Sequence, residues 1–479
     1  DPDARSLEGR FWHPTFIANL RDMPLNHLRF MDWGNTNQSP QRDWADRRPP
    51  THRHQHGILN RRSPAAGLEW YRDAEGSPVF FPGDRATGIA WEHVVALANH
   101  TGLDPWICVP HMATDDYVRK LARLFRYGSD GVEPYDAPHA NPVYAPLDPG
   151  LRVWVEYSNE IWSNGNSFPQ GEWAQAQADA DGISKPVFNA RRTSEIWSLF
   201  QDVYGGAEDL VRVAGIWTGG DFYTDPFLAE LESHGGTLSP AVRPDVIAPT
   251  TYFGNGIQDW VYQQAVQERG GDDPWFLTSH DFSSGGDVRP VSLASDDPYW
   301  SGAAIDRHTD STFREWKRRI FSGASFEGGG PDATGTGGGF SGDLRDRIRS
   351  TFGRDLPIVA YEGGPSLYTE SYDGGGPEDD GITNFLIHLN RQPQFAELYR
   401  THLNLARSKG LDTHTLFVDV SRWGKFGQWG HLEFPDQDPD ASPKWFAVKE
   451  WAQETSGLNP VDAPVGTRPG FETPGLLPG

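Results

Sequence analysis

The feature of this sequence that most constrains its fold is an alternation of short apolar runs with segments of helical periodicity. Seven runs rich in Val, Ile and aromatic residues indicate buried strands, centred near residues 28, 107, 154, 213, 247, 359 and 416. Helices are expected between them, at about 13–21, 89–100, 114–127, 170–180, 188–203, 225–234, 257–268, 311–321, 343–352, 383–409 (in two pieces) and 444–455. Strands that alternate with helices form a parallel sheet, so the sequence predicts an α/β fold.

The order of elements favours a (β/α)8 TIM barrel, which needs eight strands. If the strand near residue 28 counts as the second, the first strand is not evident in the sequence ahead of His13. Long insertions then follow strands 2 and 6, at residues 35–87 and 253–342. We expect a single catalytic domain over residues 1–456 and a Pro- and Gly-rich C-terminal tail at 457–479.

Two of the predicted strands end in a glutamate. The run that begins at Val153 leads into Asn159 and Glu160, and the run that begins at Leu356 leads into Glu362, which two glycines follow. A carboxylate just past the carboxyl end of a buried strand lies where such barrels carry out their chemistry. Hydrolysis of a glycosidic bond needs two carboxyl groups, one to protonate the leaving oxygen and one to attack or to activate water.

These two motifs, Asn159-Glu160 and Tyr361-Glu362-Gly363, resemble the fourth- and seventh-strand signatures of the clan A glycoside hydrolases, which are retaining enzymes on a (β/α)8 barrel. The resemblance implies that Glu160 is the general acid/base, that Glu362 is the nucleophile, and that Asn159 hydrogen-bonds the sugar 2-hydroxyl. The residues that flank Asn159-Glu160 match no single family of the clan.

Further residues at the predicted strand ends fit the same resemblance. Arg29 resembles the second-strand arginine that keeps the nucleophile ionised, Tyr252 resembles a tyrosine that hydrogen-bonds the nucleophile, and His111 resembles a substrate-contacting histidine. Four tryptophans that follow strands are candidate platforms for sugar rings: Trp33, Trp217, Trp423 and Trp429. Trp423 is preferred among them.

Two other functions stay open at this point. A catalytically silent carbohydrate-binding barrel would use the tryptophans and leave the glutamates idle. An inverting hydrolase would separate its carboxyl groups by ~6.5–9.5 Å, and a polysaccharide lyase would depend on a Tyr or His base near an Arg. The expected partner is a β-linked polysaccharide or oligosaccharide; an anionic one would require the arginines of the 41–62 loop to face the groove.

Composition excludes several classes of partner. The formal net charge of -24 opposes binding to nucleic acid and to anionic membranes. No window approaches the ~18 apolar residues of a membrane-spanning helix. The chain begins at Asp1, as expected of a processed product, and an extracellular or periplasmic location is expected. The oligomeric state is left open.

No cofactor or metal ion is expected. The single cysteine, Cys108, allows no intrachain disulfide and is expected to be a small buried hydrophobic residue. The alternating histidines at 52, 54 and 56 stand among arginines with no cysteine nearby, and the aspartates at 436, 438 and 440 lack the glycine and terminal Glu of a calcium loop.

Overall fold

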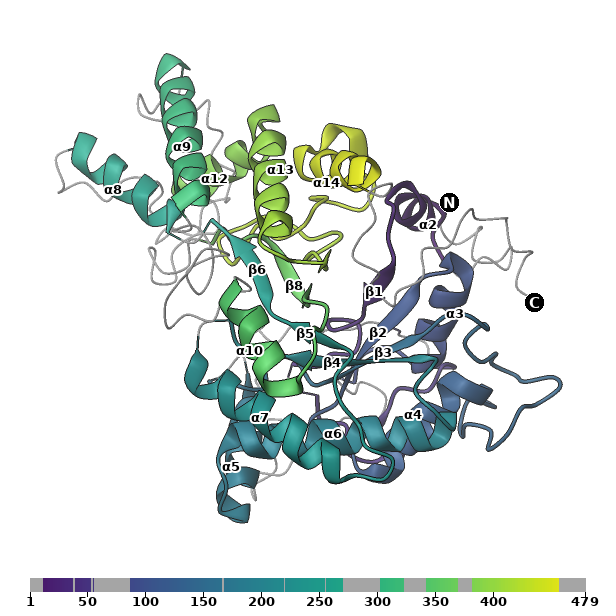
Figure 1. The fold of residues 1–479 in the computed structure, drawn as a ribbon. Coiled ribbons are helices and arrows are strands. Elements are labelled where there is room, and N and C mark those ends of the chain that lie inside the picture. The colour runs from purple at the N-terminus through teal and green to yellow at the C-terminus, as the bar shows by residue number, and fades with distance from the viewer. Residues whose placement is uncertain are drawn as a thin grey trace, which may run out of the picture.

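The structure is a computed structural model that describes residues 12–37, 39–52, 55, 87–165, 168–218, 220–254, 256–269, 302–322, 342–368 and 381–455 (Figure 1). Several predictions fall outside these residues, among them a strand ahead of residue 12, most of both insertions and the tail at 457–479. The predicted division into one domain and a tail therefore stays a prediction.

Five strands form a curled parallel sheet whose order in space is the order along the chain (Figure 1). They are β1 (His27–Arg29), β2 (Asp104–Val109), β3 (Val153–Tyr157), β4 (Leu210–Gly215) and β5 (Val246–Ala248). Every residue of β2, β3 and β5 is buried. Strands covered on both faces have this continuous apolar character, which is why periodicity in the sequence identified them.

Four further strand pieces extend this sheet: β6 (Thr250–Phe253), β7 (Val359–Ala360), β8 (Glu362–Pro365) and β9 (Thr413–His414). β6 continues β5 beyond Pro249, and β8 continues β7 beyond Tyr361. β6 pairs in parallel with β8, and β7 pairs in parallel with β9. A parallel bridge between Ile247 and Ile358 joins this part to β5. All seven predicted strand positions are therefore present.

A side chain of the first strand contacts the residue that directly follows the last strand. His27 Nε2 and Thr415 Oγ1 are 2.7 Å apart. The nine labelled strands occupy seven positions, because β6 continues β5 and β8 continues β7. The described residues contain no strand at an eighth position, so the structure confirms a curled parallel α/β sheet and not a complete eight-stranded barrel. The last strand is also shorter than the predicted 413–420, because the backbone near Val418 bonds instead to Trp429 and His431, which lie in the loop that follows.

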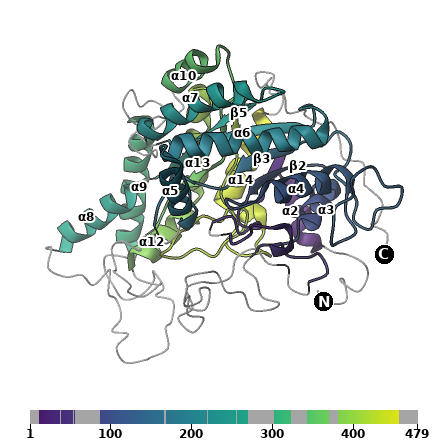
Figure 2. The same ribbon diagram turned by 90° about the horizontal axis from the view of Figure 1, so that it is seen from below.

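The helices fall where the sequence predicts them. They are α2 (Pro14–Asp22), α3 (Trp91–Thr101), α4 (Asp115–Tyr127), α5 (Pro169–Asp181), α6 (Lys185–Tyr204), α7 (Asp221–Thr237), α8 (Ile257–Arg269), α9 (Gly302–Ser322), α10 (Gly342–Phe352), α12 (Gly381–Asn390), α13 (Pro393–Ser408) and α14 (Pro443–Thr455), with short 3-10 helices at Trp44–Asp46 and Pro439–Ala441. Only α7 and α9 begin well before their predicted starts. Figures 1 and 2 place α8, α9 and α12 on one side of the molecule and α2, α3 and α4 on the other.

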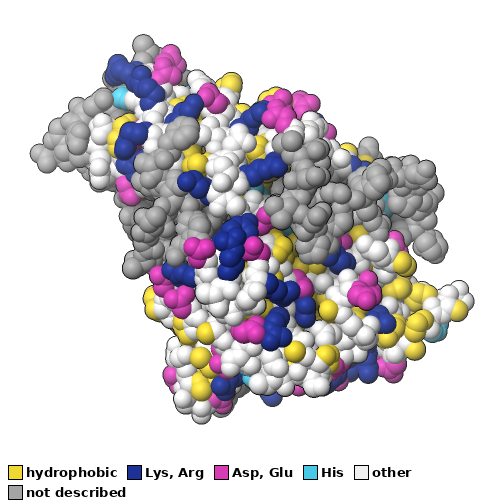
Figure 3. Space-filling view, viewed as in Figure 1, with side chains coloured by type: hydrophobic (Ala, Val, Ile, Leu, Met, Phe, Trp, Pro, Cys, Tyr) yellow, Lys and Arg dark blue, Asp and Glu magenta, His cyan; other side chains and the backbone are white. Residues whose placement is uncertain are grey.

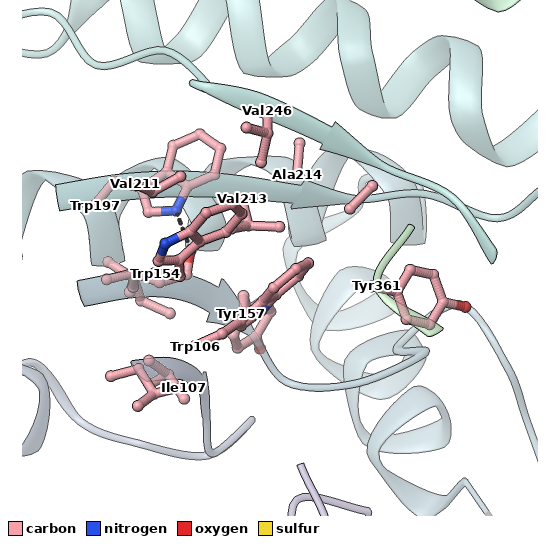
Figure 4. Close-up of a cluster of buried hydrophobic side chains, with 14 of the residues drawn as sticks. Trp106, Ile107, Trp154, Tyr157, Trp197, Val211, Val213, Ala214, Val246 and Tyr361 are labelled. Carbon is pink, nitrogen blue, oxygen red and sulfur yellow. Dashed lines mark hydrogen bonds between the residues drawn. The ribbon is translucent and has the colours of Figure 1, made fainter. Parts of the chain in front are cut away.

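Large aromatic side chains, among them Trp106, Trp154 and Trp197, belong to the buried cluster packed on the sheet (Figure 4). The rings of Trp106 and Trp154 stack with centroids 5.1 Å apart, and the His27 ring lies 4.7 Å from that of Trp154. Trp197 of α6 donates a hydrogen bond from Nε1 to the carbonyl of Val155 at 3.0 Å. The two candidate glutamates, Glu160 and Glu362, lie at the carboxyl ends of β3 and β7.

Candidate active site

Glu362, the first residue of β8, receives a hydrogen bond on each carboxylate oxygen. Arg29 of β1 donates from Nη1 to Oε1 at 2.8 Å. Tyr252 of β6 donates its hydroxyl to Oε2 at 2.9 Å. Donors on both oxygens stabilise the ionised carboxylate. The structure thus brings together the three residues that the sequence analysis predicted as the nucleophile and its two partners.

Glu160 lies after the carboxyl end of β3, and its carboxylate accepts a hydrogen bond from the residue that precedes the other candidate glutamate. The hydroxyl of Tyr361 donates to Glu160 Oε1 at 2.8 Å, and Tyr361 directly precedes Glu362. The backbone of this turn enters the left-handed region twice, with φ of 58° at Ser158 and 43° at Glu160. Each such non-glycine residue costs about 1–3 kcal/mol and is typical of functional sites.

Arg29 links the two candidate glutamate segments. Besides Glu362, it binds the carboxylate of Glu156 and the Oδ1 atom of Asn159, the latter at 2.7 Å. Burial opposes the charge of Arg29, but Cys108, Glu156 and Glu362 outweigh this effect and raise its pKa well above the usual value. Arg29 is therefore a permanent cation within the site.

Glu156 is a site residue that the sequence analysis missed. It lies on β3 with its side chain 3% exposed, and it accepts from Trp106 Nε1 at 2.8 Å and from Cys108 Sγ at 3.4 Å. Cys108 is buried as expected, yet it contacts a charged group. The signal was present in the sequence, because a glutamate inside an apolar strand requires a buried partner.

Asn159 is held in place by hydrogen bonds with two other amide side chains. Its Nδ2 atom donates to Asn37 Oδ1 at 3.0 Å, and Gln170 Nε2 donates to the same oxygen at 2.8 Å. Gln170 also donates to the carbonyl of Asn159 at 3.0 Å. Asn37 lies in the insertion after β1 and Gln170 in α5, so no local pattern indicates either contact.

Asp32 adds a further carboxyl group to this region, in the turn that follows β1. Burial and the nearby charge of Glu362 raise the pKa of Asp32 to about 6, although Arg29 acts in the opposite direction. Asp32 was not among the residues predicted from the sequence, since an aspartate in a turn is ordinarily solvated.

His111 lies at the exit of β2, as predicted, but its described contacts are structural. Its ring meets that of Trp173 edge-on at 5.3 Å, and its carbonyl accepts a hydrogen bond from the Tyr157 hydroxyl. Burial lowers the pKa of His111 to about 4, so the imidazole is neutral near pH 7. Its predicted contact with substrate stays a prediction.

The two tryptophans of the loop after β9 differ in their surroundings. Trp429 is partly exposed, and its ring meets that of Tyr252 edge-on at 5.4 Å. Trp423 is only 3% exposed, with Lys444 Nζ 4.5 Å from its ring centroid. The Trp423 ring thus packs inside the protein, and its expected role as the main sugar platform stays a prediction. Trp429 is the better-placed candidate.

Trp33 and Trp217 are also partly exposed. Trp33 packs among aromatic side chains of α2 and its surroundings, with Trp12 stacked at 5.8 Å. Trp217 meets the ring of Phe222 edge-on at 5.0 Å, and Phe222 is itself 75% exposed. The Trp33 ring therefore packs against other aromatic side chains, whereas the Trp217 ring has an exposed aromatic neighbour.

Two arginines of the 41–62 loop do not face a groove. Arg47 is buried and pairs with Glu92 of α3 at 3.1 Å. Arg48 is also buried and donates to the carbonyl of Gly88 at 2.6 Å. These residues support no binding of an anionic polymer.

Acidic and basic side chains are intermixed on the face shown in Figure 3. The arginines of α10 illustrate this arrangement through the ion pairs Arg345–Asp412, Arg347–Asp221 and Arg349–Asp355. Within the part of the chain that the structure describes, no group of three or more His, Cys, Asp or Glu side chains is arranged to hold a metal ion. None of the described helices combines the length and apolar character needed to cross a membrane.

A cavity of about 190 Å³ lies apart from the candidate residues, between α8, α9 and α12. Its lining includes Trp260, Arg307 and Phe385 and none of the residues around Glu362. The chemistry of the strand ends therefore marks the candidate active site better than this cavity does.

Comparison with known proteins gives no family. No protein-family model matches the chain, and no curated protein matches it. Among solved structures it is similar to a family 51 α-L-arabinofuranosidase from Bifidobacterium longum, with a TM-score of 0.45 and 10% identity over 92% of this chain and 66% of that one. It is also similar to the GH53 catalytic domain of Ignisphaera aggregans, with a TM-score of 0.31 and 12% identity over 89% of this chain and 96% of that one. The chain thus spans less than two thirds of the arabinofuranosidase, and TM-scores this low transfer no family or activity.

Proposed function

We propose that this protein is a retaining glycoside hydrolase that cleaves β-glycosidic bonds of a polysaccharide or oligosaccharide by double displacement. The observation that carries the proposal is the unequal environment of two glutamates from different strand ends. Glu362 binds the Arg29 cation at 2.8 Å, whereas Glu160 accepts from the neutral hydroxyl of Tyr361. A carboxylate beside a cation is suited to attack, and a carboxyl group beside a neutral donor is easier to protonate.

In this mechanism Glu362 attacks the anomeric carbon while Glu160 protonates the leaving oxygen. A glycosyl-enzyme forms, and Glu160 then removes a proton from the water that releases the sugar. Arg29 and Tyr252 hold the attacking carboxylate in one orientation through its two oxygens. Asn159, with its Oδ1 atom bound to Arg29, is the proposed partner of the sugar 2-hydroxyl.

The contacts favour an uncharged sugar at the cleavage point. Glu160, Glu362 and Asp32 are carboxyl groups in the same region. The buried arginines of the 41–62 loop, Arg47 and Arg48, bind groups within the protein. The Arg29 cation of this region is already bound by Glu156 and Glu362, so a sugar carboxylate would meet repulsion from the remaining carboxyl groups. A polymeric substrate of this kind is consistent with the extracellular or periplasmic location proposed from the sequence.

The test is turnover of a panel of defined neutral glycans by the native chain and by Glu362→Ala, with and without azide. The proposal predicts hydrolysis by the native chain and loss of activity in the variant. Azide should restore turnover and give a glycosyl azide of the anomeric configuration opposite to the native product. Full activity of Glu362→Ala would refute the assignment. Hydrolysis with inversion would favour the inverting mechanism, and an unsaturated product would favour a lyase.

Silence of the native chain on the whole panel, together with measurable glycan binding by calorimetry, would favour the carbohydrate-binding barrel. The matched control is Glu92→Gln, which alters a buried glutamate on α3 that contacts Arg47 and Ser129 rather than the candidate site.

A further inference from the structure

The guanidinium of Arg29 is divided between two carboxylates. Toward Glu156 it donates from Nε at 2.9 Å and from Nη2 at 3.1 Å, and toward Glu362 it donates from Nη1 at 2.8 Å. Glu156 thus occupies one edge of the fork in a two-point contact, whereas Glu362 has a single contact. Two-point Arg–carboxylate pairs are the stronger kind.

Glu156 is ionised in this arrangement, because the partners of its oxygens are donors. They are two nitrogens of Arg29, the indole Nε1 of Trp106 and the thiol of Cys108. A protonated carboxyl group would need an acceptor for its own hydrogen. Burial does raise the pKa of Glu156, but the Arg29 charge and the hydrogen bonds from Arg29, Trp106 and Cys108 oppose that effect.

Space for this carboxylate is built into the sheet. A Cβ atom at Gly215 of the neighbouring strand β4 would lie 3.1 Å from Glu156 Oε1. Glu156 is 2% exposed and lies on the same strand as the turn that carries Glu160. A buried charge that only filled space would be costly, since hydrophobic residues commonly replace buried ion pairs without loss of stability.

We propose that Glu156 is a positioning residue for the reaction. It binds one edge of the Arg29 guanidinium and thereby limits how strongly that cation stabilises the Glu362 carboxylate. This inference rests on the proposed function, because it assigns a consequence to Glu362 as the attacking group. With Glu156 in place, Arg29 holds the Glu362 carboxylate without binding it so tightly that attack is slowed. A carboxylate that a cation binds more tightly is less basic, and a less basic group is less reactive as a nucleophile.

Ionisable groups from several elements lie around Glu362, its partner Arg29 and its neighbour Tyr361. β1 contributes Arg29 and the turn after it contributes Asp32, β2 contributes Cys108, β6 contributes Tyr252, and β3 and its exit contribute Glu156 and Glu160. Tyr361 precedes Glu362, and His431 of the loop after β9 lies near Gly364. Of these groups, Glu156 makes the two-point contact with the cation that also binds Glu362, so its removal changes that cation most directly.

The experiment compares Glu156→Gln with the native chain by two readouts. The first is the acidic limb of the pH profile of kcat/KM. The second is the titration of the Glu362 carboxyl carbon in protein labelled with δ-13C glutamate, assigned by its absence in Glu362→Gln. Both midpoints should move to lower pH by about one unit, the lower end of the effect of a neighbouring charge. The value of kcat should fall by about three- to tenfold because Arg29 then binds Glu362 more tightly.

Glu156→Asp keeps the charge and should leave both midpoints near their native values. Glu92→Gln is the matched control, because it breaks the buried Arg47–Glu92 pair between the 41–62 loop and α3 and should lower stability without moving either midpoint. If Glu156→Gln does not fold, Trp106→Phe serves instead. Loss of the indole donor leaves the Glu156 charge less neutralised, so both midpoints should move to higher pH.

Unchanged midpoints in folded Glu156→Gln, or equal shifts in Glu156→Gln and Glu156→Asp, would overturn the inference. Failure of the proposed function is distinguishable from this outcome. If the native chain hydrolyses no glycoside, the proposed function fails, while the carbon titration still decides whether Glu156 limits the effect of Arg29 on Glu362.

Discussion

The hydroxyl of Tyr361 lies 2.8 Å from Oε1 of Glu160, so the residue directly before one candidate catalytic glutamate holds the other. The same ring lies 5.0 Å from the guanidinium carbon of Arg29, which binds Glu362. Tyr361 lies between β7 and β8, so its side chain connects the strand end that carries Glu362 with the strand end that carries Glu160. A change at Tyr361 should therefore affect the acid and leave the partners of the nucleophile in place.

Tyr361→Phe removes this hydrogen bond and retains the ring. We expect kcat/KM to fall by about tenfold on substrates with poor leaving groups, the effect of one hydrogen bond of about 1.5 kcal/mol. Substrates with activated aryl leaving groups need little acid assistance and should be affected much less. Steady-state kinetics over a leaving-group series measures the difference. Equal losses across the series would contradict the role of Tyr361 at Glu160.

Tyr252→Phe removes a donor from the proposed nucleophile instead. We expect kcat/KM to fall by about 10- to 100-fold, because hydrogen bonds to charged groups are worth about 1.5–3 kcal/mol. This loss should be similar for good and poor leaving groups. Tyr117→Phe is the control, since that buried hydroxyl of α4 bonds to Gln41 and Trp91. A Tyr252→Phe enzyme as active as the control would exclude the predicted contact from catalysis.

The strand ends were predictable from sequence because a buried parallel strand leaves a continuous apolar run. The runs before Glu160 and before Glu362 are of this kind, and they located both candidate glutamates. Tyr252 and Arg29 were found in the same way, at strand positions. The eighth strand was not found in the sequence, and it is not present among the described residues either.

The remaining site contacts join residues far apart in the chain, and no local pattern encodes them. Asn37 and Asn159 meet across an insertion, and Arg29 and Glu156 meet across the inside of the sheet. The preference for Trp423 over Trp429 likewise rested on local sequence alone. Both lie in one loop, and the local sequence does not show that Trp423 is 3% exposed beside Lys444 while Trp429 is partly exposed.

The pKa of Asp32, raised from 3.8 to about 6, predicts a pH-dependent effect of Asp32→Asn on stability. The unfolded chain releases this proton at lower pH than the folded chain. The contribution of Asp32 to stability is therefore present below about pH 4 and is lost as the pH rises through about 6. Asp32→Asn should match the native chain at pH 4 and exceed it at pH 7 by on the order of 1–3 kcal/mol.

Urea unfolding of both proteins at the two pH values measures this difference. The same gap in unfolding free energy at pH 4 and at pH 7 would show that Asp32 titrates alike in the folded and unfolded chains.

Trp429→Ala and Trp423→Ala should have opposite profiles. Loss of Trp429 should raise KM or lower kcat/KM by about 10- to 100-fold with little change in stability, because a stacked ring contributes about 1–3 kcal/mol. Loss of the buried Trp423 should cost about 3–5 kcal/mol of unfolding free energy. Kinetics and urea unfolding of both variants separate the two effects. A stable Trp423→Ala protein with weakened substrate binding would restore Trp423 as the platform.

The central claim is that Glu362 attacks the sugar. The most direct measurement is to incubate the protein with a 2-deoxy-2-fluoro glycoside of a substrate it hydrolyses, and to map the trapped sugar by mass spectrometry of peptides. One sugar per chain on the peptide that contains Glu362, absent in Glu362→Ala, is the predicted result. A label on Glu160, or complete turnover with inverted product and no label, would contradict it.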